Sequence, residues 1–576
     1  MSAPALGSLD RTASEYLRTI PLQVRRQSGQ VYTPRHLSQF ILDQAGFPSD
    51  EPRTLLDPAC GAGAFIETAI ELLAVARSRR GQALTKPRAR TAFLREVKAT
   101  IYGVDIDHHA VDLARQAARA AVAKACGIEP PKTFFDRTLL CADYLTDSTV
   151  QCFPPPHSGG FDFIVGNPPY VSALRIDAGS KRELRRRYTT AQGRIDLYTL
   201  FIERSVELLD AQGGRLAFIT PDKFLLSQTS EALRRLLLAK GALLSLARFR
   251  SHKIFEDAAT VPCVTVYERG GKPQPIALLE CGERTSKLGA VTILRRSQLS
   301  PAILATPGGW SLAHPTLRQL EQRIQGVHPQ LKTYLTRLSA GIATGYDSLY
   351  LSPADSKIDV EEALLHPTVR GRDITAFSIA DSQLRMLVPY RFNHGRPQLV
   401  ALADYPRARR YLEKHRAALE ARHCVRVWEK AWYDLHDAMP CDMGRLPKIL
   451  VPDVASHNRF AFDPGRYWPL HSAYYLVPNG IEPQFLVGVL NSAPIEFLIR
   501  LRAPVVKDGF SRYRKQFLEP LPIPYAKSRQ RRAIASAAED GDVDAVDRLM
   551  FALFEVSPRD VQQIRDFLAS RIEARR

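Results

Sequence analysis

An apolar segment that stops at two consecutive prolines constrains the fold of this chain more than any other feature. Residues 161–165 have the apolar and aromatic composition of a buried strand, and they lead into Asn-Pro-Pro-Tyr at positions 167–170. Proline has no N–H group and a fixed φ, so two prolines in a row end a β-ladder. The pattern predicts a strand that presents Asn167 and Tyr170 at its carboxyl edge, where open α/β sheets bind their ligands.

These four residues suit chemistry on an exocyclic amino group. The lone pair of an amino group on a purine ring is delocalised, so the nitrogen is a poor nucleophile. The side-chain carbonyl of Asn167 and the backbone carbonyl of Pro168 can accept its two N–H groups, and Pro168 brings no competing donor. Pro169 completes the rigid bend, and Tyr170 offers an aromatic face to an unstacked base. An ordinary turn at a strand end is the alternative reading of this motif alone.

The charge balance points to a polyanionic partner. The chain has 576 residues, with 79 Lys and Arg against 60 Asp and Glu, a formal net charge of +19. No apolar run long enough to cross a bilayer and no signal peptide is present in the sequence, so we expect nucleic acid and no membrane. The 8 cysteines form no zinc-type spacing. A reduced, cytoplasmic and nucleoid-associated protein without metal is therefore expected.

A glycine-containing turn between a strand and a helix marks a second site. The turn runs from Asp57 through Gly61 and Gly63, and a helical pattern follows over residues 66–77. Glycines allow a ligand to approach the backbone, and the start of the helix offers free N–H groups. Asp57 disfavours a phosphate and suits an ammonium group, such as that of the methionine moiety of S-adenosylmethionine. Cys60 has no evident partner base and is interpreted as a loop residue.

Two further predicted strands end in acidic residues. Residues 100–107 reach Asp105, which could bind both hydroxyls of a ribose. Residues 138–142 reach Asp143 and Tyr144, which could accept from an adenine amino group and stack on its ring. Each acid taken singly could also be a helix cap or a surface charge. Upstream, Thr33 is predicted to cap a helix that has Pro34 at its first position.

The remaining pattern extends the α/β alternation and then loses it. Residues 78–98 are interpreted as a basic, exposed insertion. Helices are predicted over 196–209 and 231–239, and strands over 214–221, 243–249 and 261–267, the last two as a hairpin. Phe255, between these two strands, could belong to the core or could face the same ligand cleft as Tyr170. From about residue 310, basic and aromatic residues interleave, for example over 422–428 and 509–515; phosphate contacts and a solvated face both fit this composition.

Together the motifs resemble the N6-adenine DNA methyltransferases of restriction–modification systems, in the class that has a C-terminal target-recognition domain. The match covers residues 30–270 by motif and extends to about 525 through weaker features. The resemblance implies an α/β fold, with a Rossmann-like S-adenosylmethionine-dependent methyltransferase domain over 1–300. Its mixed sheet should have seven strands and a final antiparallel hairpin. An α+β target-recognition domain over 310–525 and a helical segment over 526–576 should follow.

The resemblance also assigns residues to roles. The implied S-adenosylmethionine contacts are Tyr32, Thr33, Pro34, Asp57, Ala59, Gly61, Gly63, Asp105, Ile106, Asp143 and Tyr144. The implied catalytic and adenine contacts are Asn167, Pro168, Pro169, Tyr170 and Phe255. The expected partner is double-stranded DNA. Only about 30 residues precede the first motif, too few for a nuclease domain, so a separate restriction endonuclease is a candidate partner. The alternatives are methylation of RNA or of protein glutamine, and a non-catalytic DNA-binding subunit.

Overall fold

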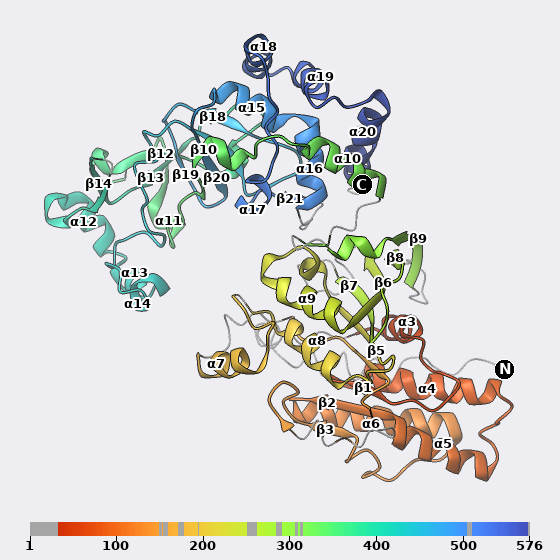
Figure 1. Cartoon of the computed structure of the whole chain (residues 1–576). Helices are drawn as coiled ribbons and strands as arrows, with labels where there is room; N and C mark the ends of the chain where they lie inside the picture. Colours follow the sequence, from red (N-terminus) through yellow and green to blue (C-terminus); the bar gives the residue numbers. More distant parts are fainter. Residues whose placement is uncertain are drawn as a thin grey trace, which may run out of the picture. The chain divides into compact units, whose positions relative to one another are not determined.

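The structure is a computed structural model, and the chain divides into two compact units, Met1–Leu312 and Ala313–Arg576 (Figure 1). The residues that the structure describes are 33–148, 153, 159–170, 178–193, 195–249, 262–283, 291–305, 309–310, 315–356, 358–394, 396–503 and 510–573.

The first unit is built on one large sheet, and five of its strands are parallel to their neighbours. In the order in which they lie side by side, they are β3 (Leu139–Cys141), β2 (Ile101–Asp105), β1 (Leu55–Asp57), β4 (Phe163–Gly166) and β5 (Arg215–Pro221). Because β1 and β4 are adjacent and parallel, the glycine turn after β1 and the proline bend after β4 lie at the same edge of the sheet. The predicted α/β fold is confirmed.

Within the described residues the sheet has nine strands, where the resemblance implied seven. Beyond β5 lie β7 (Pro262–Arg269), β6 (Gly241–Phe249), β8 (Ile276–Glu283) and β9 (Val291–Leu299). β7 is antiparallel to both β5 and β6, as the hairpin prediction required. β8 then pairs with β6 in parallel, and β9 pairs with β8 antiparallel. The two additional strands give the backbone groups of β6 a hydrogen-bonding partner on its outer side, which an edge strand would lack.

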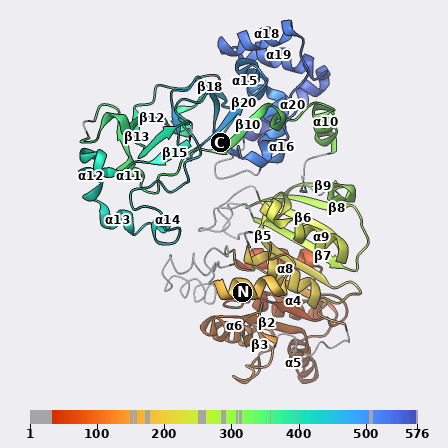
Figure 2. The ribbon, with the colours of Figure 1, turned by 60° about the vertical axis from the view of Figure 1, so that its left-hand side comes forward.

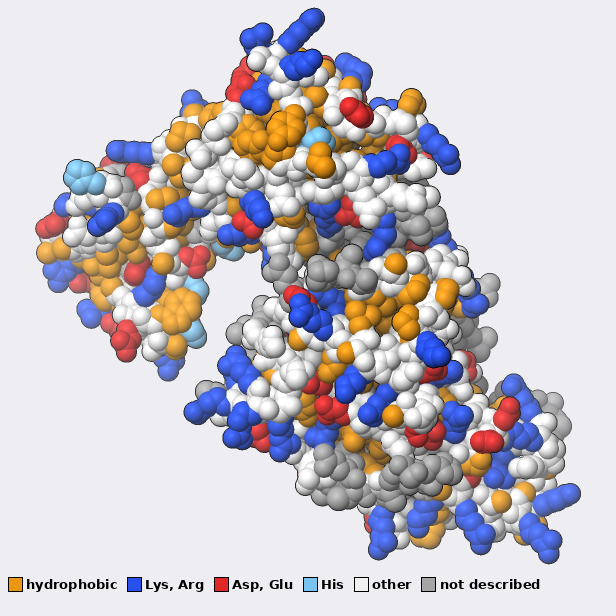
Figure 3. All heavy atoms as spheres, in the orientation of Figure 1, with side chains coloured by type: hydrophobic (Ala, Val, Ile, Leu, Met, Phe, Trp, Pro, Cys, Tyr) orange, Lys and Arg blue, Asp and Glu red, His pale blue; other side chains and the backbone are white. Residues whose placement is uncertain are grey.

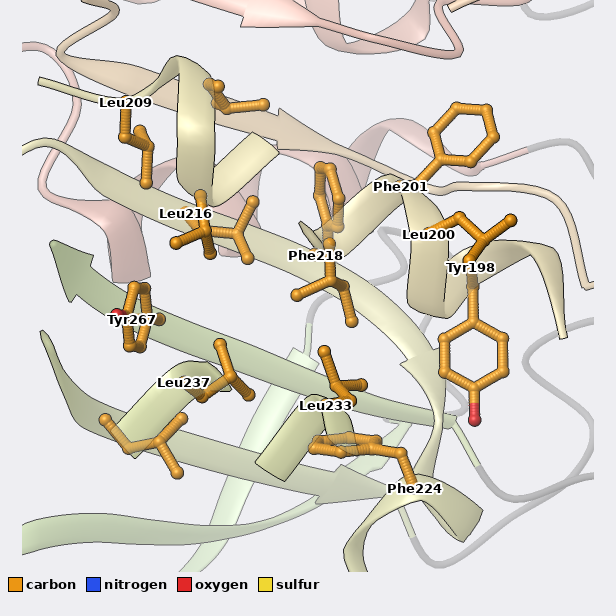
Figure 4. Packing of buried hydrophobic residues seen from close by; sticks show 14 of the residues in the cluster. Tyr198, Leu200, Phe201, Leu209, Leu216, Phe218, Phe224, Leu233, Leu237 and Tyr267 are labelled. Carbon is orange, nitrogen blue, oxygen red and sulfur yellow. The ribbon is translucent and has the colours of Figure 1, made fainter. Parts of the chain in front are cut away.

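Helices cover both faces of this sheet. One apolar cluster contains buried side chains of α3 (Arg35–Ala45), α4 (Ala64–Arg79), α5 (Pro87–Thr100) and α6 (His108–Cys126). The opposite cluster contains side chains of α7 (Ala178–Arg187), α8 (Leu197–Leu208) and α9 (Glu231–Lys240). Leu55 and Leu56 of β1 belong to different clusters, as neighbouring residues of a strand should. Figure 4 shows α8, α9, β5 and β7 side chains meeting in the second cluster.

One segment of this unit was predicted wrongly. The basic residues between 78 and 98 led us to expect an exposed insertion, but α5 occupies most of it. Phe93 and Val97, four residues apart, are fully buried in the core, while Arg88 and Arg95 are exposed. A single apolar stripe is sufficient to dock a helix whose other faces are charged.

The second unit contains two four-stranded sheets. In the first, β10 (Leu335–Ala340), β20 (Ala473–Pro478), β16 (Lys448–Pro452) and β18 (Ala461–Asp463) are all antiparallel. In the second the order is β11 (Leu351–Pro353), β13 (Leu384–Leu387), β12 (Leu365–Val369) and β19 (Trp468–Pro469). Two smaller pairs are β14 (Tyr390–Asn393) with β15 (Arg396–Leu399), and β17 (Val454–Ala455) with β21 (Ser511–Arg512).

Helices complete the second unit. They are α10 (Pro315–Gln325), α11 (Asp347–Tyr350), α12 (Pro406–Glu413), α13 (Arg416–Glu420), α14 (His423–Arg426), α15 (Pro483–Asn491), α16 (Ala493–Arg502), α17 (Lys515–Leu518), α18 (Ser528–Glu539), α19 (Val543–Leu553) and α20 (Pro558–Glu573). Figures 1 and 2 both show α18 beside α15. The buried Ile534, Met550 and Ile564 of the last three helices share one core with α15 and α16.

Among the described helices, no single one has the length and apolar character to cross a bilayer. The pair α15 and α16 meets those criteria only jointly, across a bend of 61°. Most side chains of both helices are buried in the core of the second unit.

Candidate active site at the strand ends of the first unit

The two motifs that define the site come together at the ends of β1 and β4. Leu56 of β1 lies opposite Ile164 of β4, so Asp57 and Gly166 are the last residues of neighbouring strands. A Cβ atom on Gly166 would lie 2.7 Å from Oδ1 of Asp57. Glycine is therefore required here, because any side chain would displace the Asp57 carboxyl group from the edge of the sheet.

Asp57 is a buried acid with an unsatisfied oxygen. Its side chain is 1% exposed, and Oδ1 accepts the N–H of Ala59 at 3.1 Å. Oδ2 has no hydrogen-bond partner among the described residues. Burial raises the pKa of Asp57 to about 8; the Ala59 N–H opposes this rise, and the nearby Asp105 carboxyl adds to it. A cation at this place would offset the desolvation of the carboxylate, which is the property expected of an ammonium-binding group.

The turn after β1 is held by the next strand end. The Asp105 carboxyl group at the end of β2 accepts the N–H of Gly61 at 2.8 Å and that of Asp107 at 3.0 Å. Burial is also the main cause of a raised pKa at Asp105. Gly61 has φ +50°, and a Cβ there would meet nothing within 4 Å, so the space beside it is open to a ligand. Gly63, at φ +93°, lets α4 approach the backbone of α6, because a Cβ would lie 2.9 Å from Cα of Ala114.

The remaining predicted cofactor residues differ in their surroundings. Ile106 follows Asp105 and is 72% exposed, which is unusual for an isoleucine and leaves its side chain available at the sheet edge. The Asp143 carboxylate accepts the N–H of Leu145 at 2.9 Å and the hydroxyl of Thr146 at 2.7 Å, as a local turn does.

Tyr144 occupies a core position. Its side chain is 2% exposed, and its hydroxyl is 2.9 Å from that of Ser205. Its ring stacks on Phe201 with centroids 5.0 Å apart, and the guanidinium of Arg204 lies 5.3 Å from the ring centroid. These neighbours occupy ring surface that the prediction reserved for adenine. We therefore revise the expectation for Tyr144 from a stacking residue to one that packs β3 against α8.

Thr33 has a different local role from the one predicted. Helix α3 begins at Arg35 with Pro34 in the capping position, and no side chain caps it. The hydroxyl of the buried Thr33 instead accepts the side-chain N–H of Asn167 at 3.1 Å. The oxygen of that amide, Asn167 Oδ1, is buried and has no partner among the described residues. Thr33 thus orients the amide so that its oxygen stays available as an acceptor.

The bend after β4 is anchored on the next strand. Pro168 is buried, and the Tyr170 hydroxyl donates to the Ile219 carbonyl of β5 at 3.0 Å. The ring of Tyr170 packs against the apolar cluster that includes α3 and α4. Burial holds the pKa of Tyr170 well above its usual value, so the hydroxyl stays protonated and keeps donating. Tyr32 and Phe255, predicted as cofactor and adenine contacts, lie outside the described residues.

Sequence reasoning missed two ion pairs at the end of β5. Asp222, the residue after β5, accepts from Arg248 of β6 at 2.8 Å. Lys223 pairs with Asp196, which precedes α8, also at 2.8 Å. The signal that identified Asp57, an acid directly after an apolar strand, is present at Asp222 as well. Among the described residues, no group of three side chains is arranged to hold a metal ion.

Family models match segments of both units of the chain. Residues 99–255 match the Eco57I restriction-modification methylase family, residues 32–127 match an RMKL-like methyltransferase domain, and residues 366–523 match the TaqI-like C-terminal specificity domain. The fold is similar to that of the type IIL restriction-modification enzyme MmeI, solved in complex with DNA. The TM-score is 0.60 at 13% identity, over 98% of this chain and 76% of that one.

Two curated relatives match along almost their whole length. The type II methyltransferase M.PaeR7I of Pseudomonas aeruginosa is 30% identical over 548 residues, 92% of each chain. M.BstVI of Geobacillus stearothermophilus is 26% identical over 571 residues, 94% of this chain and 99% of that protein. The methyl donor is S-adenosylmethionine. With this extent of similarity, the chain belongs to the type II methyltransferases of restriction–modification systems, DNA methyltransferases with a C-terminal recognition domain.

Proposed function

We propose that this enzyme methylates N6 of adenine in double-stranded DNA, and that the adenine leaves the base stack to reach the site. The observation that carries this proposal is the buried Oδ1 of Asn167, which has no hydrogen-bond partner among the residues that the structure describes. Asn167 directly follows Gly166, the strand end that lies against Asp57. A buried acceptor without a partner is costly, and a substrate N–H group would satisfy it.

The residues at the strand ends fit the cofactor. Asp57 Oδ2 is a buried acceptor that suits the ammonium group of the methionine moiety. The open space beside Gly61 leaves room at the turn. Asp105 would bind the ribose hydroxyls, Ile106 would contact the adenine ring, and Asp143 would accept from its amino group. Tyr32, Thr33, Pro34, Ala59 and Gly63 would complete the pocket as its wall and backbone, with Thr33 acting chiefly through Asn167.

The catalytic residues would act by orienting the adenine amine toward the methyl group. When bound, S-adenosylmethionine supplies a methyl group activated by a positively charged sulfur. Asn167 Oδ1 and the Pro168 carbonyl would accept the two N–H groups of the adenine amine, which would turn its lone pair toward that methyl. The nitrogen would gain the methyl group while the methyl–sulfur bond breaks and its electron pair stays on sulfur. The nitrogen would then release one proton, because the alkylated amine is acidic. No strong base is required before transfer, so orientation is the main contribution of the protein.

The base would be held by aromatic contacts. The hydrogen bond from Tyr170 to the Ile219 carbonyl anchors the ring of Tyr170 on β5, and Phe255 would supply a second ring. Unstacking and unpairing one adenine costs a few kcal/mol, which stacking on aromatic side chains offsets in part. The net charge of +19 and the match of the second unit to a specificity domain support duplex DNA as the substrate. Restriction would then belong to a separate endonuclease.

The test is to identify the methylated product. The full chain is incubated with S-adenosylmethionine carrying a labelled methyl group, and with duplex DNA, single-stranded DNA, RNA or bacterial protein. The nucleosides or amino acids are then separated by mass spectrometry. We expect N6-methyladenine in duplex DNA. Methylcytosine, methylated RNA or methylated glutamine as the main product would refute the proposal.

A variant pair tests the site itself. Asn167→Ala should abolish methyl transfer while cofactor binding, followed by calorimetry, is retained. Asn479→Ala, at an exposed asparagine of the second unit, is the matched control and should keep full activity. Normal turnover by Asn167→Ala would contradict the proposed role of the amide.

A further inference from the structure

Helix α7 of the first unit carries the densest positive charge of any described helix. Residues 178–187 contain five basic side chains and one acidic one, a net charge of 5 − 1 = +4. Arg182, Arg185, Arg186 and Arg187 are all exposed. Figure 3 shows blue side chains gathered over α7, at the left-hand edge of this unit. The function proposed above leaves this helix without a role.

Most of these arginines have no counter-charge. Arg187 lies 3.4 Å from Glu183, whereas Arg182, Arg185 and Arg186 make no ion pair or hydrogen bond within the part of the chain that the structure describes. Arg182 lies three and four residues before the other two, a spacing at which like charges destabilise a helix. By contrast, in α12 Arg409 has a counter-charge on its own helix, because it pairs with Glu413 at 2.8 Å. The unpaired arginines of α7 therefore suit an external anion better than a merely solvated face.

The helix is firmly attached at its carboxyl end. Leu184 is buried in the core, and the Tyr188 hydroxyl donates to the Leu145 carbonyl at 2.6 Å. The Arg187 guanidinium donates to the Thr146 carbonyl, also at 2.6 Å. These contacts fix the backbone from which the exposed arginines project, so that little backbone entropy would be lost when a rigid partner binds.

A buried glutamate holds the residues that follow the helix. Glu203 of α8 is 2% exposed, and its carboxylate accepts four hydrogen bonds of 2.6–2.8 Å. The donors are the backbone N–H and the hydroxyl groups of Thr189 and Thr190. With four donors the carboxylate is well satisfied, and the chain after α7 is tied to the body of the unit.

The position of α7 relates it to the candidate active site. The helix starts eight residues after Tyr170 in the chain. It is docked on Leu145 and Thr146, which follow Asp143 at the carboxyl end of β3. That end is the same sheet edge that holds Asp57, because the strands between them are parallel.

We propose that α7 binds backbone phosphates of duplex DNA beside the nucleotide that enters the site. This inference rests on the proposed function for its substrate class. Guanidinium groups bind phosphate through paired N–H donors, and an array fixed on a helix would hold the sugar–phosphate backbone in register with the strand edge. Such contacts position the DNA and carry no sequence information.

The experiment compares two triple variants of the full chain. In the first, Arg182, Arg185 and Arg186 are changed to Ala. In the control, three equally exposed arginines of α4 and α5 are changed to Ala, which removes the same charge from the same unit; they are Arg79, Arg88 and Arg95. Binding to a fluorescent 30-base-pair duplex is measured by anisotropy over a range of salt concentrations, and methyl transfer to unmethylated genomic DNA is measured in parallel.

For the α7 variant we expect the slope of log Kd against log salt to fall by about two to three, since each phosphate contact contributes roughly 0.9. The control should keep the wild-type slope. Both variants should keep the wild-type melting temperature and cofactor affinity. Changing Arg182, Arg185 and Arg186 to Lys keeps the charge and should retain most of the slope. If the arginines acted only by packing, this variant would lose the slope as the Ala variant does.

Three outcomes would overturn the inference. The first is an unchanged salt slope in the α7 variant, and the second is an equal fall of the slope in the control. The third is found by repeating the binding measurement with an RNA hairpin: the α7 variant loses affinity for the RNA and keeps wild-type affinity for duplex DNA. Binding is read without catalysis, so the two proposals fail separately. If the wild-type protein methylates another base and the α7 variant shows the reduced slope, only the adenine assignment is refuted. A normal adenine methyltransferase with an unchanged slope refutes only the role of α7.

Discussion

Replacing Asp57 by Asn should stabilise the first unit when no cofactor is bound. Burial raises the pKa of Asp57 from 3.8 to about 8. At pH 7 the carboxyl group is therefore mostly protonated in the folded chain and ionised in the unfolded one. The difference between pH 7 and 3.8, at about 1.4 kcal/mol per pH unit, corresponds to about 4 kcal/mol of lost stability. Asparagine keeps the acceptor for Ala59 and does not ionise.

The sign of the pH dependence is opposite to that of a carboxylate in a salt bridge. Between pH 4 and 8 the folded state binds more protons at Asp57 than the unfolded state does, so the free energy of unfolding falls as the pH rises. The steepest slope should be about 1.4 kcal/mol per pH unit. An unpartnered amide N–H in the variant costs about 1 kcal/mol, so we expect a net gain of about 3 kcal/mol and a rise of about 5 °C in Tm at pH 7.

Scanning calorimetry of the full chain from pH 5 to 8 checks this, with and without S-adenosylmethionine. The difference between the wild-type and Asp57→Asn curves isolates Asp57 from the other titrating groups. Asp50→Asn, at a fully exposed carboxyl group, is the control and should follow the wild type. The cofactor should stabilise the wild type and stabilise Asp57→Asn much less. The reasoning would be refuted if the Tm of the wild type and that of Asp57→Asn changed equally with pH, or if Asp57→Asn had the lower Tm at pH 7.

Three further substitutions test other parts of the structure. Thr33→Val removes the acceptor that orients the Asn167 amide; the loss of about 1 kcal/mol should lower the rate of methyl transfer about fivefold in single-turnover assays at saturating S-adenosylmethionine. Gly63→Ala forces a side chain into a left-handed conformation against α6 and should destabilise the first unit by about 2 kcal/mol, measured by the urea midpoint. Lys448→Met leaves the buried Asp463 carboxylate without its ion-pair partner and should cost the second unit about 3–5 kcal/mol; an unchanged urea midpoint would exclude that role.

The sheet could be predicted because its signals are local. An apolar run followed by a breaker marks a strand end, and the carboxyl ends of parallel strands meet at one edge. That rule is sufficient to bring Asp57, Asp105 and Asn167 together without knowledge of any contact. The same rule would have placed Asp222 at this edge, although not its ion pair with Arg248.

The parts that could not be predicted depend on contacts between distant residues. Thr33 and Asn167 are 134 positions apart, and a threonine before a proline has an adequate local explanation as a helix cap. An aromatic residue after an acid, as at Tyr144, is equally consistent with a ligand contact and with a position in the core. The sequence pattern does not show which residues pack against its ring. In α5 the many basic residues obscured the two buried ones, Phe93 and Val97.

Two acceptors at this sheet edge, Asp57 Oδ2 and Asn167 Oδ1, are buried without partners in the described structure. Such groups destabilise a folded protein, so their occurrence at the ends of neighbouring strands needs a reason. The two differ in charge: a carboxyl group favours a cation, and an amide oxygen favours a neutral N–H. The methyl donor, which bears an ammonium group, and the amine that we propose as the acceptor would require that same pair of chemistries side by side. Under the proposed function, the stability lost at these two atoms is a consequence of keeping the binding groups for both substrates in place before either substrate binds.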